Sequence, residues 1–173
     1  MHPQAVAAAL FAEGRPVGPG PPLPGVAESG MLSPVAATPV PNGCDPAVDR
    51  VLAEARARIA PRVAPRDLEA ALVGGALVVD TRSVAQRDRD GVLPGAVIVE
   101  RNVLEWRLDP TSPHRLGQMD GLDRRVIVVC DEGYGSSLAA ASLADLGLTD
   151  VTDLEGGYQA WMRVRGADGA ATP

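Results

Sequence analysis

One cysteine ends the clearest strand-like run of the sequence, VIVVC, and the residues DEGYGSS follow it. Gly133 and Gly135 allow the backbone after Cys130 to curl tightly, with residues at positive φ. Successive N–H groups can then point inward as a nest, which the positive end of the following helix completes. Such a nest favours a thiolate, so Cys130 is a candidate nucleophile whose covalent adduct is also anionic.

The other residues of this loop set its charge and shape. Ser136 and Ser137 can cap the helix that they begin and donate hydrogen bonds into the loop. Asp131 and Glu132 bring two negative charges, which oppose the nest and disfavour a second anion nearby. Tyr134 either shields the sulfur or lies on the surface. We expect residues 131–137 to form a substrate-binding loop around the cysteine.

Short apolar runs alternate with helical patterns in the second half of the chain. The expected strands are ALVVD (76–80), GAVIV (95–99), VIVVC (126–130) and DVTDLEGG (150–157), and the expected helices cover 102–108, 136–147 and 157–166. This alternation predicts an α/β fold with a central, mainly parallel sheet and helices on both faces. Ligand sites in such sheets lie beyond the carboxyl ends of the strands, where both Asp80 and Cys130 fall.

The first part of the chain has a different composition. Residues 14–43 are crowded with Pro and Gly, so we expect a disordered tail over 1–44, within which Met31 is an alternative start to Met1. A helix is expected over 45–60, with Asp45 as its N-cap and Pro46 at its first position. Its apolar stripe comprises Val48, Val51, Leu52, Ala55 and Ile59. A second short helix opens an α/β domain over 61–167, and residues 168–173 are expected to be flexible.

Composition excludes several classes of partner. The formal net charge of −6 argues against nucleic acid or an anionic membrane surface as a partner. No apolar run reaches the roughly 18 residues of a membrane span, and the N-terminus lacks the basic region of a signal peptide. The two cysteines, Cys44 and Cys130, lie far apart, which fits a reducing cytoplasm better than a disulfide. Cys44 is expected to be an incidental exposed thiol of the tail.

Four segments, in this order, resemble the rhodanese (sulfurtransferase) family. VVDTR (78–82) is similar to its strand-end Asp-x-Arg, GVLPGAV (91–97) to its His-Ile-Pro-Gly-Ala element, VVCDEGYGSS to its cysteine loop, and DLEGGYQAW (153–161) to its final strand and Gly-Gly turn. The resemblance covers roughly residues 61–167 and implies a rhodanese-like fold. It also implies sulfur transfer through a persulfide on Cys130, from a small-molecule or protein sulfur donor to a thiol acceptor.

The sequence departs from the family pattern in ways that leave alternatives open. The loop lacks the basic residue with which many members bind thiosulfate, and Val92 stands in the place of the family's His. A non-catalytic rhodanese-like binding or regulatory module therefore remains an alternative, as does a sulfenic-acid redox sensor. A cysteine phosphatase or arsenate reductase is disfavoured, because Gly135 and Ser136 stand where an Arg would close the loop.

The remaining candidates favour structural roles. Asp80 and Arg82 could be catalytic, but an ion pair that braces the strand end is the favoured interpretation. His114 lies in a polar loop and is expected to be solvated, while Trp106 and Trp161 are expected in the core or at a pocket rim. No Cys/His cluster has metal-ligand spacing and no glycine-rich loop precedes a Lys-Ser/Thr pair, so neither a metal nor another cofactor is expected.

Overall fold

A computed structural model describes residues 46–59 and 61–169, and the structural statements below refer to these residues. One parallel sheet, in the order β2-β1-β3-β4, forms the centre. Its strands are β1 (Leu77–Asp80), β2 (Val97–Ile98), β3 (Val126–Val129) and β4 (Val151–Asp153). A parallel bridge between Val63 and Leu154 extends the sheet beyond β4. The predicted parallel sheet is confirmed, although each strand is shorter than its apolar run.

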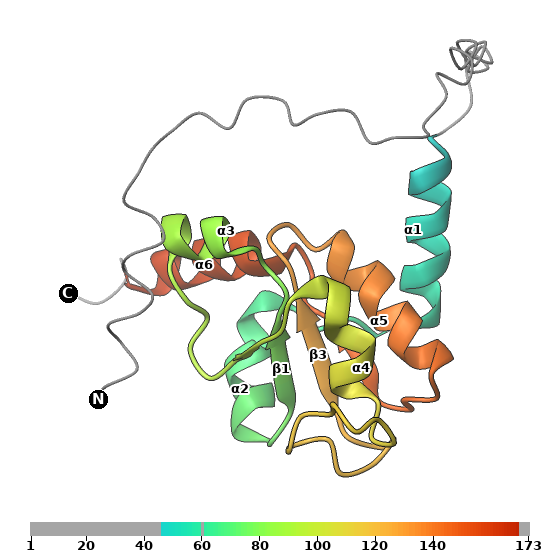
Figure 1. Cartoon of the computed structure of the whole chain (residues 1–173). Helices are drawn as coiled ribbons and strands as arrows, with labels where there is room; N and C mark the ends of the chain where they lie inside the picture. Colours follow the sequence, from blue (N-terminus) through green and yellow to red (C-terminus); the bar gives the residue numbers. More distant parts are fainter. Residues whose placement is uncertain (1–45, 60, 170–173) are drawn as a thin grey trace, which may run out of the picture. The chain divides into compact units, whose positions relative to one another are not determined.

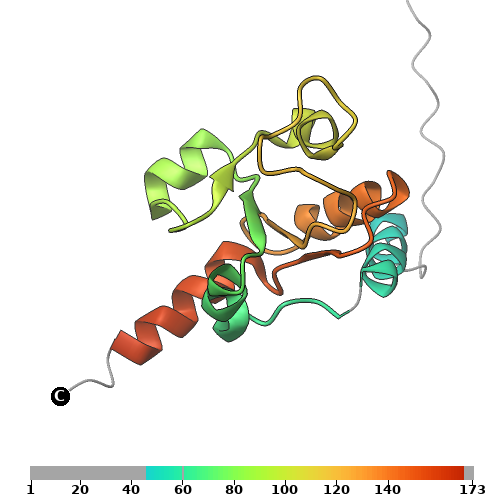
Figure 2. The same ribbon diagram turned by 90° about the horizontal axis from the view of Figure 1, so that it is seen from below.

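Helices cover both faces of this sheet, as predicted (Figures 1 and 2). They are α1 (Ala47–Arg58), α2 (Leu68–Val73), α3 (Val84–Asp90), α4 (Leu104–Leu108), α5 (Gly135–Asp145) and α6 (Gly157–Gly169), with 3-10 turns at η2 (Pro65–Asp67) and η3 (Arg101–Val103). Helix α3 was not expected. Its signal is a capping box, in which Ser83 Oγ accepts from Gln86 N and Gln86 Oε1 accepts from Ser83 N.

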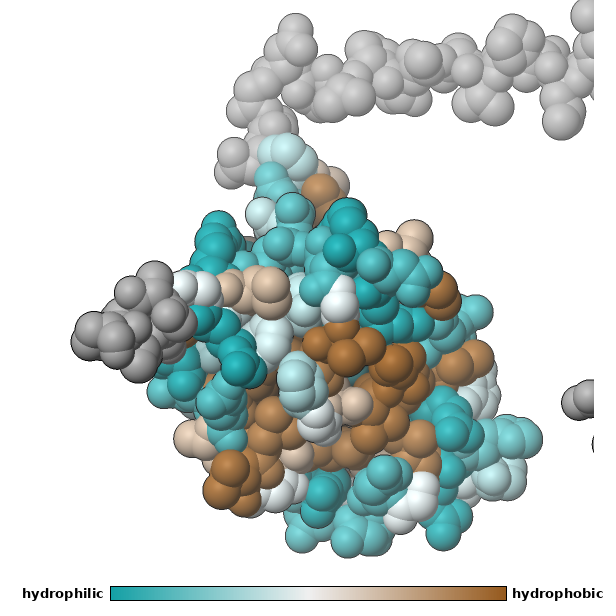
Figure 3. Space-filling model, turned by 90° about the vertical axis from the view of Figure 1, so that its left-hand side faces the viewer, coloured by the Kyte–Doolittle hydropathy of each residue, from teal (hydrophilic) through white to brown (hydrophobic). Residues whose placement is uncertain are grey.

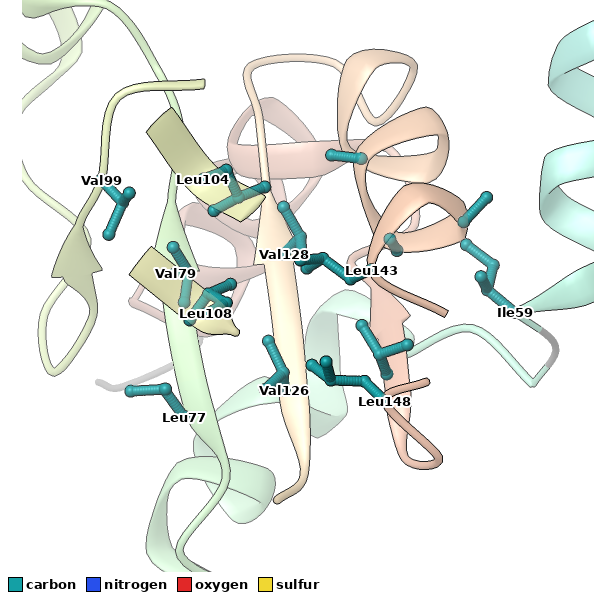
Figure 4. Close-up of a cluster of buried hydrophobic side chains, with 14 of the residues drawn as sticks. Ile59, Leu77, Val79, Val99, Leu104, Leu108, Val126, Val128, Leu143 and Leu148 are labelled. Carbon is teal, nitrogen blue, oxygen red and sulfur yellow. The ribbon is translucent and has the colours of Figure 1, made fainter. Parts of the chain in front are cut away.

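Strand side chains alternate between two hydrophobic layers. Leu77 and Val79 of β1 pack in one cluster with buried residues of α1, α4 and α5, as Figure 4 shows for its labelled side chains. Val78 packs in the other cluster, with residues of α2 and α6. Because both faces of β1 and β3 are buried, these strands are continuous apolar runs in the sequence rather than alternating ones.

Helix α1 differs from its prediction in two respects. Pro46 is the N-cap, so the helix begins at Ala47, and Asp45 lies outside the described residues. Leu52, Ala55 and Ile59 are buried, but Val48 and Val51 of the predicted stripe are exposed. The reason lies in the packing, because only the later part of α1 joins the core beside α5.

The two tryptophans have different environments. Trp161 is buried, packs 5.3 Å from Tyr158 between ring centroids, and rims an apolar groove of about 310 Å³ between α2 and α6. Trp106, on the short helix α4, is 58% exposed, so a core position for it is wrong. Figure 3 shows one face of the molecule on which hydrophobic residues gather, with hydrophilic residues around them.

Several expectations concern residues that the structure does not describe. The disordered tail over 1–44, Met31, Cys44 and the last residues from 170 onward all lie outside the described ranges. Helix α6 continues to Gly169, past the predicted domain end at 167. Within residues 46–59 and 61–169, no helix is long and apolar enough to span a membrane.

The strand order places a crevice between β1 and β3. The chain leaves β1 toward its neighbour β2 on one side, and leaves β3 toward β4 on the other. At such a point the two connections diverge, and a crevice opens beyond the carboxyl ends of the strands. Asp80 and Cys130 lie at these two strand ends, since Asp80 pairs in register with Val129.

Candidate active site

Cys130 lies at the mouth of this crevice. Its side chain is partly buried, and it lines a pocket of about 240 Å³ together with Thr81, Arg82 and Gln86. The backbone N–H and the hydroxyl of Thr81 both donate to the carbonyl of Val129, at 2.8 and 2.9 Å. These bonds hold the segment after β1 beside the strand that ends at the cysteine.

The loop after Cys130 forms a nest around the sulfur. The N–H groups of Gly133 and Ser136 donate to Sγ at 3.2 and 3.3 Å, and Ser136 Oγ lies 3.2 Å from it. Gly133 has a φ of +75°, which glycine adopts without strain. Gly135 has no positive φ and simply begins α5. The expected nest therefore depends on one of its two glycines.

The two serines do not cap α5 with their side chains. Tyr134 is the N-cap residue, and no side chain caps this helix. Both serine hydroxyls instead donate to Oδ2 of Asp153, at 2.9 Å from Ser136 and 2.8 Å from Ser137. Asp153 is fully buried at the end of β4. The capping prediction was wrong because α5 begins at Gly135, which places both serines inside its first turn rather than at the N-cap.

The Gly-Gly turn lets α6 dock directly on the cysteine loop. The first N–H groups of α6, those of Tyr158 and Gln159, donate to the carbonyls of Cys130 and Asp131 at 2.9 and 3.0 Å. A Cβ on Gly157 would lie 2.5 Å from the Cys130 carbonyl oxygen, and the residue has a φ of +60°. Glycine is therefore required at this position for both space and conformation.

Asp80 and Arg82 form a buried ion pair behind the site. Arg82 Nη2 lies 2.8 Å from Asp80 Oδ2 and 2.9 Å from the Gly91 carbonyl oxygen. The guanidinium also stacks 3.4 Å from the centroid of the Tyr158 ring. The pair connects the end of β1 with α6, and its carboxylate oxygens are occupied by Arg82. This arrangement braces the strand end.

The acidic residues of the loop have different surroundings. Asp131 pairs with Arg89 at 3.2 Å and accepts from Gln159 at 3.0 Å. The hydrogen bond between Arg89 and Asp90 is the main cause that raises the pKa of Arg89 and lowers the pKa of Asp90. The opposite charge of each partner contributes in the same direction. Glu132 is exposed and forms no ion pair with any residue in the described ranges. Its charge is therefore the uncompensated one at the mouth.

A polar groove of about 690 Å³ adjoins the cysteine pocket. It is lined by Arg89, Asp90, Asp131, Glu132, Tyr134, Gly156, Gln159 and Arg163. Tyr134 is 56% exposed and lines both this groove and the cysteine pocket. Of the two interpretations of this ring, the surface position is the one observed.

Two arginines that sequence reasoning did not associate with the site reach the loop. Arg56 of α1 donates to the Gly133 carbonyl at 2.8 Å, and Arg62 pairs with Asp153 at 2.6 Å. No pattern in the loop indicates them, because they lie far upstream in the sequence. His114, as predicted, is exposed. Among the described residues, no group of three or more His, Cys, Asp or Glu side chains could hold a metal ion.

Comparisons with known proteins agree with this architecture. The family model of the Rhodanese-like domain matches residues 64–163. A thiosulfate sulfurtransferase GlpE from Pseudomonas savastanoi is 32% identical over 58% of this chain and 85% of its own length. Another, from Shewanella oneidensis, is 46% identical, but the match covers 28% of this chain and 46% of that relative.

Solved structures show the same fold. A Rhodopseudomonas palustris protein of unknown function, described as a possible tyrosine phosphatase, is 30% identical with a TM-score of 0.62 and covers 73% of this chain and 97% of its own. A human single-domain sulfurtransferase is 25% identical with a TM-score of 0.52, and the match covers 60% of this chain and 96% of that one.

The docking of α6 on the loop predicts that Gly157→Ala disrupts the site. The added Cβ meets the Cys130 and Asp131 carbonyls and the Gly133 N–H, which are backbone atoms that cannot rotate away. We expect a loss of several kcal/mol of stability or, where the chain folds, a displaced loop with slower alkylation of Cys130 by iodoacetamide. Gly166→Ala, in the same helix with open space around it, should be neutral or stabilise by about 0.5–1 kcal/mol. Equal behaviour of the two variants would contradict the docking role.

Proposed function

The chain belongs to the Rhodanese-like domain family, and from this premise we propose that it is a sulfurtransferase which passes sulfane sulfur through a persulfide on Cys130. The observation that carries the proposal is the sulfur itself, which accepts two backbone N–H groups at the mouth of an open pocket. A buried structural cysteine needs neither the nest nor the pocket. A reducing compartment such as the cytoplasm would keep Cys130 available as a thiol.

The reaction proceeds in two displacement steps. The Cys130 thiolate attacks the outer sulfur of the donor, the donor's sulfur–sulfur bond breaks, and the remainder leaves with the bonding electron pair. An acceptor thiolate then attacks the outer sulfur of the Cys130 persulfide, forms its own persulfide and regenerates the Cys130 thiolate. No net oxidation occurs, because each sulfur–sulfur bond that breaks is replaced by another.

The nest suits both anionic forms of the site. The Gly133 and Ser136 N–H groups can donate to a thiolate or to a persulfide anion, and the N-terminus of α5 adds a favourable dipole. In the thiol form, the S–H of Cys130 donates to Ser136 Oγ, whose own proton is directed to Asp153. Once the thiol loses its proton, the two backbone donors remain in place, so little reorganisation accompanies the reaction.

The charge at the mouth determines which donors are favoured. Arg89 compensates Asp131, while Glu132 faces the solvent beside the cysteine pocket without an ion pair among the described residues. A divalent anion such as thiosulfate is repelled there more strongly than a monovalent persulfide group or a neutral sulfane donor. We therefore infer that a small-molecule or protein persulfide is a better donor than thiosulfate, although the relatives are named for thiosulfate.

A phosphatase activity is less compatible with this loop. A phosphate bound over Cys130 would need a cation that closes the loop, and Gly135 and Ser136 occupy the positions where an Arg would do so. Arg82 borders the pocket, but its guanidinium is paired with Asp80. We expect no hydrolysis of p-nitrophenyl phosphate by the purified protein. A non-catalytic binding module remains the outcome if no donor loads the cysteine.

Intact-mass measurement tests the nucleophile. The wild-type chain should gain about 32 Da, the mass of one sulfur, after exposure to a sulfane donor, as thiolate attack requires. Cys130→Ser should gain nothing, and Cys44→Ser should behave as wild type. Loading of Cys130→Ser would show that another residue receives the sulfur. Failure of the wild type with every donor would favour the binding module.

Substitutions at the mouth test donor preference. Gly135 has open space around its Cβ position and no positive φ, so Gly135→Arg can be accommodated. Glu132→Gln and Gly135→Arg should each raise thiosulfate turnover by about threefold or more relative to turnover of a neutral donor, and added salt should reduce the gain. Glu69→Gln removes an equal charge from a residue that lines neither pocket at Cys130, and should leave the ratio unchanged. If Glu132→Gln and Gly135→Arg, like the control, left the ratio of thiosulfate turnover to neutral-donor turnover unchanged, electrostatic selection of the donor would be ruled out.

A further inference from the structure

The Gly133 carbonyl attracts an unusual concentration of donors. Arg56 Nη2 donates to it at 2.8 Å and Arg62 Nη2 at 3.4 Å, and Ser137 Oγ lies at 3.1 Å with its single proton shared between this carbonyl and Asp153. Two of these three donors are cationic, and charged donors form the stronger hydrogen bonds. Neither arginine belongs to the loop, which contains no basic residue between Asp131 and Ser137.

Gly133 is also one of the two residues whose N–H groups bind the sulfur. Its N–H donates to Cys130 Sγ at 3.2 Å, from a backbone with a φ of +75°. Glycine has the most conformational freedom of all residues, so by itself it holds this geometry poorly. Anchoring its carbonyl to Arg56 and Arg62 restricts its rotation and thereby keeps the N–H directed at the sulfur.

The second backbone donor, the N–H of Ser136, is anchored through Arg62. Arg62 binds both carboxylate oxygens of Asp153, with Nε to Oδ1 at 2.6 Å and Nη2 to Oδ2 at 3.0 Å. The same Oδ2 accepts the hydroxyl protons of Ser136 and Ser137. The buried carboxylate thus links Arg62 to the beginning of α5, where the Ser136 N–H points at Sγ.

Charge adds to this geometry. The hydrogen bond with Asp153 is the main cause that raises the pKa of Arg62, and the negative charge of a Cys130 thiolate contributes in the same direction. Arg62 thereby holds a permanent positive charge at the edge of the cysteine loop, where its Nη2 reaches the Gly133 carbonyl. Arg56 adds a second positive charge and lies 5.6 Å from the centroid of the Tyr134 ring. The two cations oppose the negative charges of Asp131 and Glu132.

We propose that Arg56 and Arg62 are positioning residues for Cys130, which supply from outside the loop the fixed geometry and positive charge that the loop's own sequence lacks. Both precede residue 64, where the match to the family model begins. Helix α1 and the segment after it are therefore part of the active-site machinery rather than an appendage. The inference rests on the proposed role of Cys130 as the nucleophile.

The test measures how fast iodoacetamide alkylates Cys130 in the full-length protein, near neutral pH and at an alkaline plateau where the thiol is fully ionised. All variants are made in the Cys44→Ser background, so that Cys130 is the only thiol that iodoacetamide can alkylate. Arg56→Gln and Arg62→Gln should each lower the ratio of neutral to plateau rate by about threefold to tenfold, because each removes a charge and an anchor. Asp131, Glu132, Arg82 and Asp153, the other charged groups around the sulfur, are unchanged in these variants.

Arg58→Gln is the matched control. Arg58 lies on the same helix and joins α1 to α5 through Asp145 and the Ala141 carbonyl, without contact to the cysteine loop. Its loss should lower the thermal midpoint without changing the alkylation ratio. If the effect came only from a weaker contact between α1 and α5, Arg56→Gln and Arg58→Gln would lower the alkylation ratio by similar amounts.

The variants also separate charge from geometry. Arg56→Lys retains the charge but not the fork that binds the Gly133 carbonyl and Ser137 Oγ together, so it should restore the ratio only in part. Removing Arg62 leaves Asp153 buried without its cation and can prevent folding, in which case Arg56→Gln decides alone. If the folded Gln variants keep the wild-type ratio, the proposal is wrong. Alkylation requires no sulfur donor. The role of the two arginines can therefore be judged even if the protein transfers no sulfur.

Discussion

The site depends on the contact between the cysteine loop and the first turn of α6. The N–H groups of Tyr158 and Gln159 would otherwise be unsatisfied at a helix N-terminus, and the carbonyls of Cys130 and Asp131 would be unsatisfied where the strand ends. The N–H groups of the helix and the carbonyls of the loop satisfy one another, but only because the two backbones approach within contact distance. Glycine at 133 and 157 permits this approach, and it fixes the cysteine at one position relative to the sheet.

This contact also explains why the structural ion pair lies where it does. Arg82 stacks on Tyr158, the residue whose N–H holds the Cys130 carbonyl, and Tyr158 donates its hydroxyl proton to the Asp90 carbonyl. The segment after β1, helix α3 and helix α6 are thereby joined beneath the pocket. Asp80 and Arg82 influence Cys130 through these contacts, while the N–H groups that bind the sulfur come from its own loop.

Charge around Cys130 is distributed over segments that are distant in sequence. The charged residues of the loop itself are both acidic, and Arg89 of α3 pairs with one of them. Arg56 and Arg62 come from upstream of the sheet, and they bind a loop carbonyl and a buried carboxylate. The residues to which we attribute donor selection therefore differ from those that we propose support the nest.

The sequence by itself determined the strands, their parallel arrangement, the position of Cys130 at a strand end and its glycine-containing loop. These features follow from local patterns, because burial on both faces produces apolar runs and tight turns require glycine. Only the tertiary structure decided the partners of the loop. Arg56 and Gly133 are 77 positions apart, and the carboxylate that accepts the serine hydroxyl protons is Asp153 of another strand. Which distant side chains meet depends on how α1 and β4 pack beside α5, and no local periodicity encodes that packing.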